Sequence, residues 1–143
     1  MKTELPANKP GPTHMQIHLS PAVAMRILVT GSRDWLNFVT VHKALDAILF
    51  DLNHPPVLVH GAANGVDTVA AGYWKSFGYP VEPHPADWNR YGRKRAGIIR
   101  NAQMVQAGAD QCLAFIRNHS RGATHCSQLA IKSGIPTTIY RET

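Results

Sequence analysis

Short apolar runs separated by stretches of helical periodicity constrain the fold of this chain more than any other feature of its sequence. Apolar runs with the length of buried strands cover residues 26–30, 57–60 and 111–116. Two further short segments, 80–84 and 136–140, are also expected to be strands. Between them, apolar residues recur every three or four positions, over residues 37–52, 65–77, 98–106 and 121–133. Because alternating strands and helices require right-handed crossovers, we expect a parallel sheet with helices on both faces.

The alternation predicts an α/β fold of the Rossmann-like, three-layer type over residues 25–143, with a five-stranded parallel sheet in the order 3-2-1-4-5. The strand at 80–84 is placed at an edge because prolines flank it. The sheet order reverses between strands 1 and 4, so a ligand crevice should open there, lined by the loops after strands 1, 2 and 4. Residues 1–24 hold four prolines and no sustained periodicity. We expect them to form a flexible leader, or an upstream extension if Met25 is the true start.

Composition and charge narrow the partners of this domain. The 143 residues carry a net charge of +6 and have a pI near 9.7, which favours an anionic partner. No apolar run is long enough to cross a membrane, and no secretory signal opens the sequence. Cys112 and Cys126 are expected to be reduced, buried thiols, so we expect a cytoplasmic protein. No metal site is expected, because histidines and cysteines lack zinc spacing; magnesium bound together with a phosphate stays open.

Two glycine-containing loops follow the first two strands. In TGSRD, at 30–34, glycine allows close approach of a ligand and Arg33 offers a fork of donors; a plain turn with a surface salt bridge is the alternative. HGAANGVD, at 60–67, leads into a helix start whose amides and dipole favour an anion. His60 is expected to be a hydrogen-bonded histidine at the core edge, and Asp67 either stabilises the helix or contacts a ligand. The predicted ligand contacts here are Gly31, Ser32, Arg33, Asp34, His60, Gly61, Asn64, Gly65 and Asp67.

A third loop, at residues 117–125, again opens a helix with small and hydroxyl side chains beside two arginines. Two such helix starts, at Gly65 and Gly122, would clasp a phosphate between facing dipoles. The predicted ligand contacts in this loop are Ser120, Arg121, Gly122, Ala123 and Thr124.

Residues 87–101 combine five basic side chains with two aromatic ones. We interpret this segment as a lid in which Trp88 or Tyr91 stacks on a base while the following helix points Arg100 and Asn101 into the crevice. Contact with nucleic acid is a rival interpretation, with cations on phosphates and aromatic rings on bases. A solvated basic loop is the third. The predicted ligand contacts here are Asp87, Trp88, Arg100 and Asn101.

The motifs TGSRDW, HGAANGVD, PADW with RN, and SRGATH with AIKSGIP resemble the small SLOG-fold proteins related to YspA and YpsA. The resemblance covers nearly all of residues 25–143 and implies a Rossmann-like domain for nucleotides or nucleotide-derived ligands. It also implies kinship with the LOG phosphoribohydrolases, whose PGGxGTxxE motif carries a glutamate, and with the DNA-processing protein DprA. The matching stretch at 119–128 keeps Gly122 but has no glutamate, only Gln128. Glycosidic cleavage wants a carboxylate near an oxocarbenium-like transition state.

Three hypotheses about function result. The first is a non-catalytic domain that senses or sequesters a nucleotide or ADP-ribose-type ligand through Arg33, Arg100 and Arg121. The second is an N-glycoside hydrolase for nucleoside monophosphates, with Asp67 or Asp87 as the acidic group. The third is a DNA- or RNA-binding module. The resemblance also implies a homodimer, because enzymes of the related branch are commonly dimers.

Overall fold

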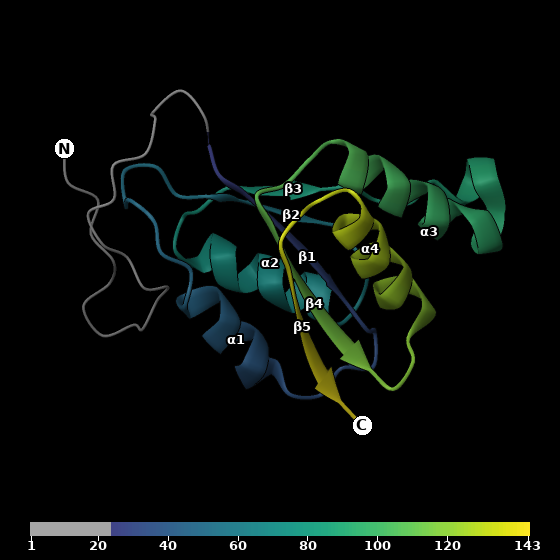
Figure 1. The fold of residues 1–143 in the computed structure, drawn as a ribbon, viewed down its shortest axis with the longest axis horizontal. Helices are drawn as coiled ribbons and strands as arrows, with labels where there is room; N and C mark the ends of the chain where they lie inside the picture. Colours follow the sequence, from purple (N-terminus) through teal and green to yellow (C-terminus); the bar gives the residue numbers. More distant parts are fainter. Residues whose placement is uncertain (1–23) are drawn as a thin grey trace.

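A computed structural model describes residues 24–143, so the leader expected at 1–24 lies outside the described residues except for Ala24. Strands and helices alternate through the described part (Figure 1). They are β1 (Arg26–Gly31), α1 (Phe38–Asp46), β2 (Val57–His60), α2 (Val66–Ser76), β3 (Val81–Pro83), α3 (Trp88–Gln106), β4 (Gln111–Arg117), α4 (Arg121–Lys132) and β5 (Thr137–Glu142). The strands form one parallel sheet in the order β3-β2-β1-β4-β5. The predicted fold class and strand order are confirmed.

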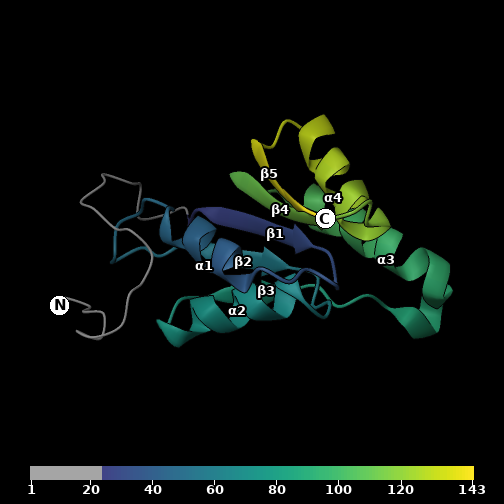
Figure 2. The ribbon, with the colours of Figure 1, turned by 90° about the horizontal axis from the view of Figure 1, so that it is seen from below.

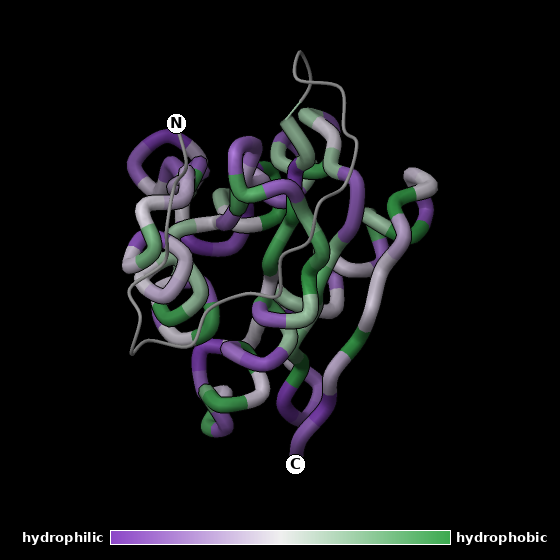
Figure 3. The backbone as a smooth tube through the Cα atoms, turned by 90° about the vertical axis from the view of Figure 1, so that its left-hand side faces the viewer, coloured by the Kyte–Doolittle hydropathy of each residue, from purple (hydrophilic) through white to green (hydrophobic). Residues whose placement is uncertain are grey.

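The sheet separates two hydrophobic cores, because successive residues of a strand point to opposite faces. Ile27 and Val29 of β1 pack against α1 and α2. Leu28, between them, packs with Met104 of α3 and Cys126 of α4. Figures 1 and 2 show the two helix pairs on opposite faces, and Figure 3 shows hydrophobic residues concentrated in the central strands. Both faces are covered, so each central strand is an almost continuous apolar run.

Helix α1 is shorter than the periodicity over 37–52 predicts, because it ends at Asp46. The Ile48 amide donates to the Leu45 carbonyl at 3.2 Å, which closes the last turn. Ile48 and Phe50 then enter the core from irregular chain. The apolar spacing beyond residue 46 therefore reflects a buried connection rather than a helix.

Helix α3 is longer than predicted, because it includes most of the segment expected to be a polar loop at 85–97. The Asp87 carboxylate caps its start by accepting the Arg90 amide at 3.1 Å. At Gly92 the backbone leaves helical geometry, with φ 78° and ψ 171°, a region open in practice only to glycine. The helix thus consists of one turn before Gly92 and a longer part after it. The first part of α3 extends beyond the body of the domain in Figure 2, so this stretch needs no apolar face.

The end of β1 packs tightly on the start of α2. A Cβ placed on Gly31 would lie 2.4 Å from the Val66 Cβ. One placed on Gly65, which has φ +84°, would lie 2.7 Å from the Arg33 carbonyl oxygen. Only glycine permits either approach, and the two loops after β1 and β2 are held side by side as a result.

None of the helices between residues 24 and 143 combines the length and apolar character needed to cross a bilayer.

Candidate functional site

A cleft with a volume of about 680 Å³ lies beyond the carboxyl ends of β1, β2 and β3. Its walls come from the loop after β1, the loop after β2, the segment after β3 and one side of α3. The lining residues are Arg33, Gly61, Ala62, Ala63, Asn64, Pro85, Ala86, Trp88, Arg93 and Arg100. Three of them are arginines and none is acidic, so the cleft carries positive charge. Several of the other lining residues are small.

The carboxylate of Asp67, in the first turn of α2, holds the conformation of the loop after β2. Asp67 Oδ2 accepts the amide of Gly61 at 2.9 Å and that of Ala63 at 3.3 Å. The amide between them, of Ala62, donates to His60 Nδ1 at 3.0 Å. Three successive amides of the predicted anion cradle therefore already have partners within the protein. Asp67 takes the structural role that the sequence left open, and His60 is the hydrogen-bonded core-edge histidine that was expected.

Both partners are buried, and burial shifts their protonation. Asp67 is 4% exposed, which raises the pKa of its carboxyl from near 3.8 to about 6, although the Ala63 and Gly61 amides and Arg100 oppose the shift. Burial likewise lowers the pKa of His60 and favours its neutral ring. The second oxygen of Asp67 is buried and has no hydrogen-bond partner among the described residues. Leaving this oxygen without a hydrogen bond costs free energy, and the two hydrogen bonds of the other oxygen to the loop offset part of that cost.

Arg100 lines the cleft and is held by hydrogen bonds to its neighbours. Its Nη1 donates to the Gly61 carbonyl and, at 3.4 Å, to the His84 carbonyl, while Nε donates to Asn101 Oδ1 at 2.9 Å. Gly61 makes this possible, because a Cβ there would lie 2.6 Å from Nη1. Desolvation lowers the pKa of Arg100, partly offset by the nearby Asp67. The guanidinium is therefore fixed by two backbone carbonyls and a neighbouring amide side chain.

Asn101 links Arg100 to the first turns of α4 through hydrogen bonds. Its side chain is buried, and Nδ2 lies 3.3 Å from the Gly122 carbonyl and 3.2 Å from His125 Nδ1. Arg100 and Asn101 thus lie between the loop after β2 and the first turn of α4. This part of α3 occupies the topological switch point, where the crevice was expected.

Trp88 lines the cleft close to Arg100. The break at Gly92 turns the first helical turn back, so that Trp88 Cη2 lies 3.9 Å from the position a Cβ on Gly97 would take. Because Gly97 has no side chain, the indole can pack against the helix backbone next to Arg100. Trp88 nonetheless remains 42% exposed, and its free area lines the cleft.

The other predicted contacts do not line the cleft. Ser32 is buried, and its hydroxyl accepts the Arg117 amide at 2.8 Å. The Asp34 carboxylate lies 4.0 Å from Arg117 Nε, and Asp34 does not line the cleft.

The remaining predicted contacts have structural roles or lie outside the cleft. Gly31 and Gly65 allow the close packing of β1 on α2, while Asp87 caps α3. Also outside the wall are His60, Asp67 and Asn101, which support it from below, and the residues of the α4 start, Ser120, Arg121, Gly122, Ala123 and Thr124.

The lining of this cleft differs from the predicted set of loops 1, 2 and 4, because the segment after β3 and α3 contribute to it and the loop after β4 does not. The cause is that α3 fills the space between β2 and α4. Ala62, Ala63, Pro85, Ala86 and Arg93 were not among the predicted contacts, yet they line the cleft. Ala62 carries a signal only in its backbone, which has φ 56° in the left-handed region. Arg93 had a usable sequence signal, because it lies seven residues before Arg100 on the same helix face.

The fold and the cleft together define a class: a Rossmann-like α/β domain with an arginine-lined cleft at the carboxyl ends of parallel strands. Within that class, the chain belongs to the YspA, cpYpsA-related SLOG family, whose model matches residues 25–91. It is also 46% identical over 116 residues to the Gene 61 protein of Mycobacterium phage D29, an alignment that covers 78% of this chain and 92% of that protein. No solved structure matches the chain. The family resemblance drawn from the motifs is confirmed.

Proposed function

We propose that this domain binds a small phosphorylated ligand of the nucleotide type in the cleft between the loop after β2 and α3. The observation that carries the proposal is the presence of Arg33, Arg93 and Arg100 in one cleft without a carboxylate in its wall. A guanidinium presents donors in a planar fork that suits phosphate oxygens. A neutral ligand would leave these three positive charges without a counter-charge in the cleft.

Preorganisation supports the same conclusion. Arg100 is held by Gly61, His84 and Asn101 before any ligand arrives, so little side-chain entropy is lost on binding. The phosphate is expected on the guanidinium groups rather than on the amides of 61–63, because Asp67 and His60 already accept from those amides.

Trp88 supports a nucleotide over a simple phosphate ester. Its indole is exposed beside Arg100 and is held against the helix, a suitable surface for stacking of a base. The volume of about 680 Å³ lies within the range usual for small-molecule sites, so the cleft has room for both base and phosphate.

Hydrolysis of an N-glycoside has less support in the geometry. The reaction requires a carboxylate near the sugar, and the aspartates considered for it have other positions. Asp67 is buried under the loop, Asp87 caps α3, and Asp34 does not line the cleft. We therefore propose sensing or sequestering of the ligand as the function.

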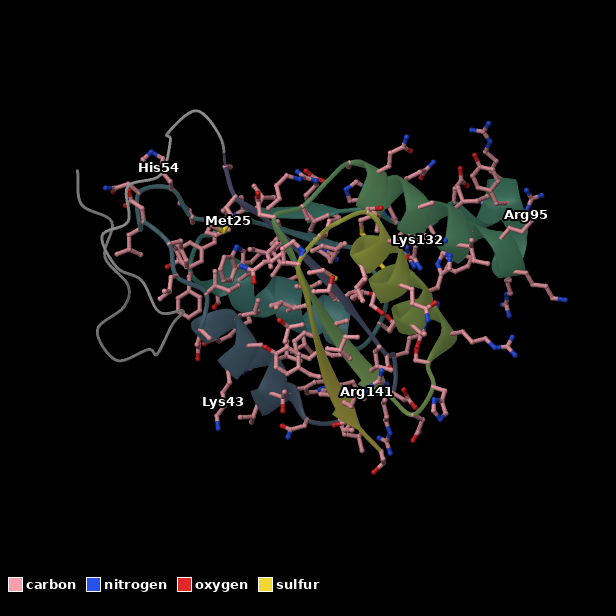
Figure 4. All side chains as sticks on the ribbon, viewed as in Figure 1. Met25, Lys43, His54, Arg95, Lys132 and Arg141 are labelled. Atoms are coloured by element: carbon pink, nitrogen blue, oxygen red, sulfur yellow. The ribbon has the colours of Figure 1, made fainter. Side chains whose placement is uncertain are left out.

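Thermal denaturation with a panel of ligands tests the proposal. Inorganic phosphate, pyrophosphate, AMP, ADP and ADP-ribose should be compared with adenosine, which lacks the phosphate. A true ligand at one hundred times its Kd should stabilise the fold by about 2.7 kcal/mol. Arg33→Ala and Arg93→Ala should remove most of that gain. Arg141→Ala, which changes an exposed residue of β5 (Figure 4) that does not line the cleft, should leave it. Absence of stabilisation by every phosphorylated compound would refute the proposal.

A further inference from the structure

The start of α3 forms a cationic tip, made up of Arg90, Arg93, Lys94 and Arg95. All four side chains are exposed, and Arg95 lies at the outer end of the helix in Figure 4. Figure 2 shows this end of α3 beyond the body of the domain. None of the four has an ion-pair partner within residues 24–143. Elsewhere arginines do have acidic partners, as Arg26 has in Glu82.

The tip is continuous with the cleft. Arg93 belongs to both, since it lines the cleft and lies next to Lys94. Arg93 and Arg100 are seven residues apart, so they share a helix face about 10 Å apart along the axis. An anionic chain that leaves the cleft past Arg93 would therefore meet further cations on the tip.

Aromatic rings accompany these cations on the same segment. Trp88 is 42% exposed in the cleft wall, and the Arg90 guanidinium lies 5.1 Å from the centre of the Tyr91 ring. A basic surface interleaved with aromatic rings suits unstacked bases joined by phosphates. The bases of a duplex are already stacked on one another, so these rings favour a single strand.

We propose that the ligand of the cleft is the phosphorylated end of a single-stranded nucleic acid, with its terminal nucleotide in the cleft and its next phosphates on the cationic tip. This inference rests on the proposed function and extends it, because a mononucleotide would use the cleft and leave the tip without a partner. The charge complementarity of the tip extends over more than one phosphate, and the volume of the cleft limits the buried part to about one nucleotide.

The test measures binding of oligothymidylates of one, two, four and eight nucleotides, with the phosphate on either the 5′ or the 3′ end, by fluorescence anisotropy of a label on the opposite end. Affinity should rise over the first few nucleotides and then level off. The affinity for the longer strands should also fall with salt, each phosphate contact adding about 0.7 to the slope of log K against log salt. A Lys94→Gln/Arg95→Gln double variant should reduce this slope by about 1.4 and weaken octanucleotide binding at least tenfold, with no change for the mononucleotide.

Two controls separate this inference from the proposed function. The Lys132→Gln/Arg141→Gln variant removes the same charge from a surface away from the tip (Figure 4), and it should bind the octanucleotide as the wild type does. Polyglutamate of equal charge should bind at least tenfold more weakly; equal binding would overturn the inference by showing unspecific polyanion contact. If the mononucleotide binds and strand length has no effect, the inference fails and the proposed function stands. If strands bind but Arg33→Ala changes nothing, the terminal nucleotide is not in the cleft and the inference is wrong.

Discussion

At the scale of single residues, the central feature is that the loop after β2 receives its negative charge from the protein itself. A glycine- and alanine-rich loop before a helix suggests a phosphate cradle, but Asp67 occupies the amides of Gly61 and Ala63. Asp67 is 4% exposed, and burial of a charged group is costly unless hydrogen bonds replace its solvation. The loop is therefore held by hydrogen bonds within the protein itself, and the stability of the fold should depend on pH.

Replacement of Asp67 by asparagine should remove one component of the pH dependence of stability. The pKa of Asp67 is raised from 3.8 to about 6 in the folded state, so the folded protein binds more protons than the unfolded one between these values. Stability from this group is then full below about pH 4, decreases as pH rises, and is constant above about pH 6. The difference between wild type and Asp67→Asn, from urea unfolding at pH 4 to 7, should fall by on the order of 3 kcal/mol across this window.

His60 contributes with the opposite sign in part of that window, because its lowered pKa makes stability rise with pH. It is present in both proteins, so the difference curve cancels it. Asp87→Asn, which changes a carboxyl on the exposed cap of α3, should keep the wild-type slope. A flat difference curve for Asp67→Asn would contradict the prediction.

At the scale of elements, α3 combines three tasks. Its turn before Gly92 brings Trp88 to the cleft, its middle supplies Arg93 and Arg100, and its last turns bury Met104 against the sheet. The glycine break separates the first task from the others. Since glycine alone adopts φ 78° with ψ 171° at low cost, the orientation of the first turn depends on this residue.

Substitution of Gly92 by alanine should reorient Trp88. Alanine would be strained by about 1–3 kcal/mol in the observed conformation, so the segment should relax and release Trp88 from Gly97. Trp35 and Trp74 are buried, and acrylamide quenching of tryptophan fluorescence therefore reports mainly on Trp88. Quenching should increase in Gly92→Ala, with little loss of global stability.

Gly122→Ala is the matched control for this experiment. Gly122 lies in the first turn of α4 without a positive φ, and a Cβ there has open space around it. The substitution should leave quenching unchanged. Unaltered quenching in Gly92→Ala would show that the break does not position Trp88.

At the scale of the whole molecule, the sheet carries stability while its carboxyl edge carries the candidate site. The core on the α1 and α2 side contains several aromatic rings, among them Phe115, which is fully buried. Phe115 lies 5.6 Å from Trp35 edge to face and 4.8 Å from Tyr140 in a stacked pair, measured between ring centres. These contacts join β4 to β5 and to the loop after β1.

Phe115→Ala should therefore be severely destabilising. Removal of a fully buried phenylalanine costs about 3–5 kcal/mol through lost transfer energy and a cavity, out of a total of about 5–15 kcal/mol for a domain of this kind. Urea unfolding should show a lower midpoint with an unchanged slope. Ile139→Ala, at a 38% exposed site on β5, should cost no more than about 1 kcal/mol, and a similar loss in both variants would contradict the importance of this cluster.

The strands and their parallel order could be read from the sequence, and the reversal of the sheet order predicted a crevice at the carboxyl ends of the strands. These follow from apolar periodicity and from the handedness of crossovers, both of which depend on residues close together in the chain. Arg33, Arg100 and Trp88, which the sequence suggested as ligand contacts, line the cleft, because parallel strands bring the segments after them to one edge of the sheet.

Which of these residues share one cleft depends on how the elements pack in three dimensions. Asp67 accepts hydrogen bonds from its own loop, α3 lies between the loop after β2 and the start of α4, and Arg93 lines the cleft. Each of these depends on distances between side chains far apart in the sequence, and on helix packing that periodicity does not specify. Local pattern determines the layers of an α/β domain, whereas the crossing of one helix over the sheet determines where its cleft lies.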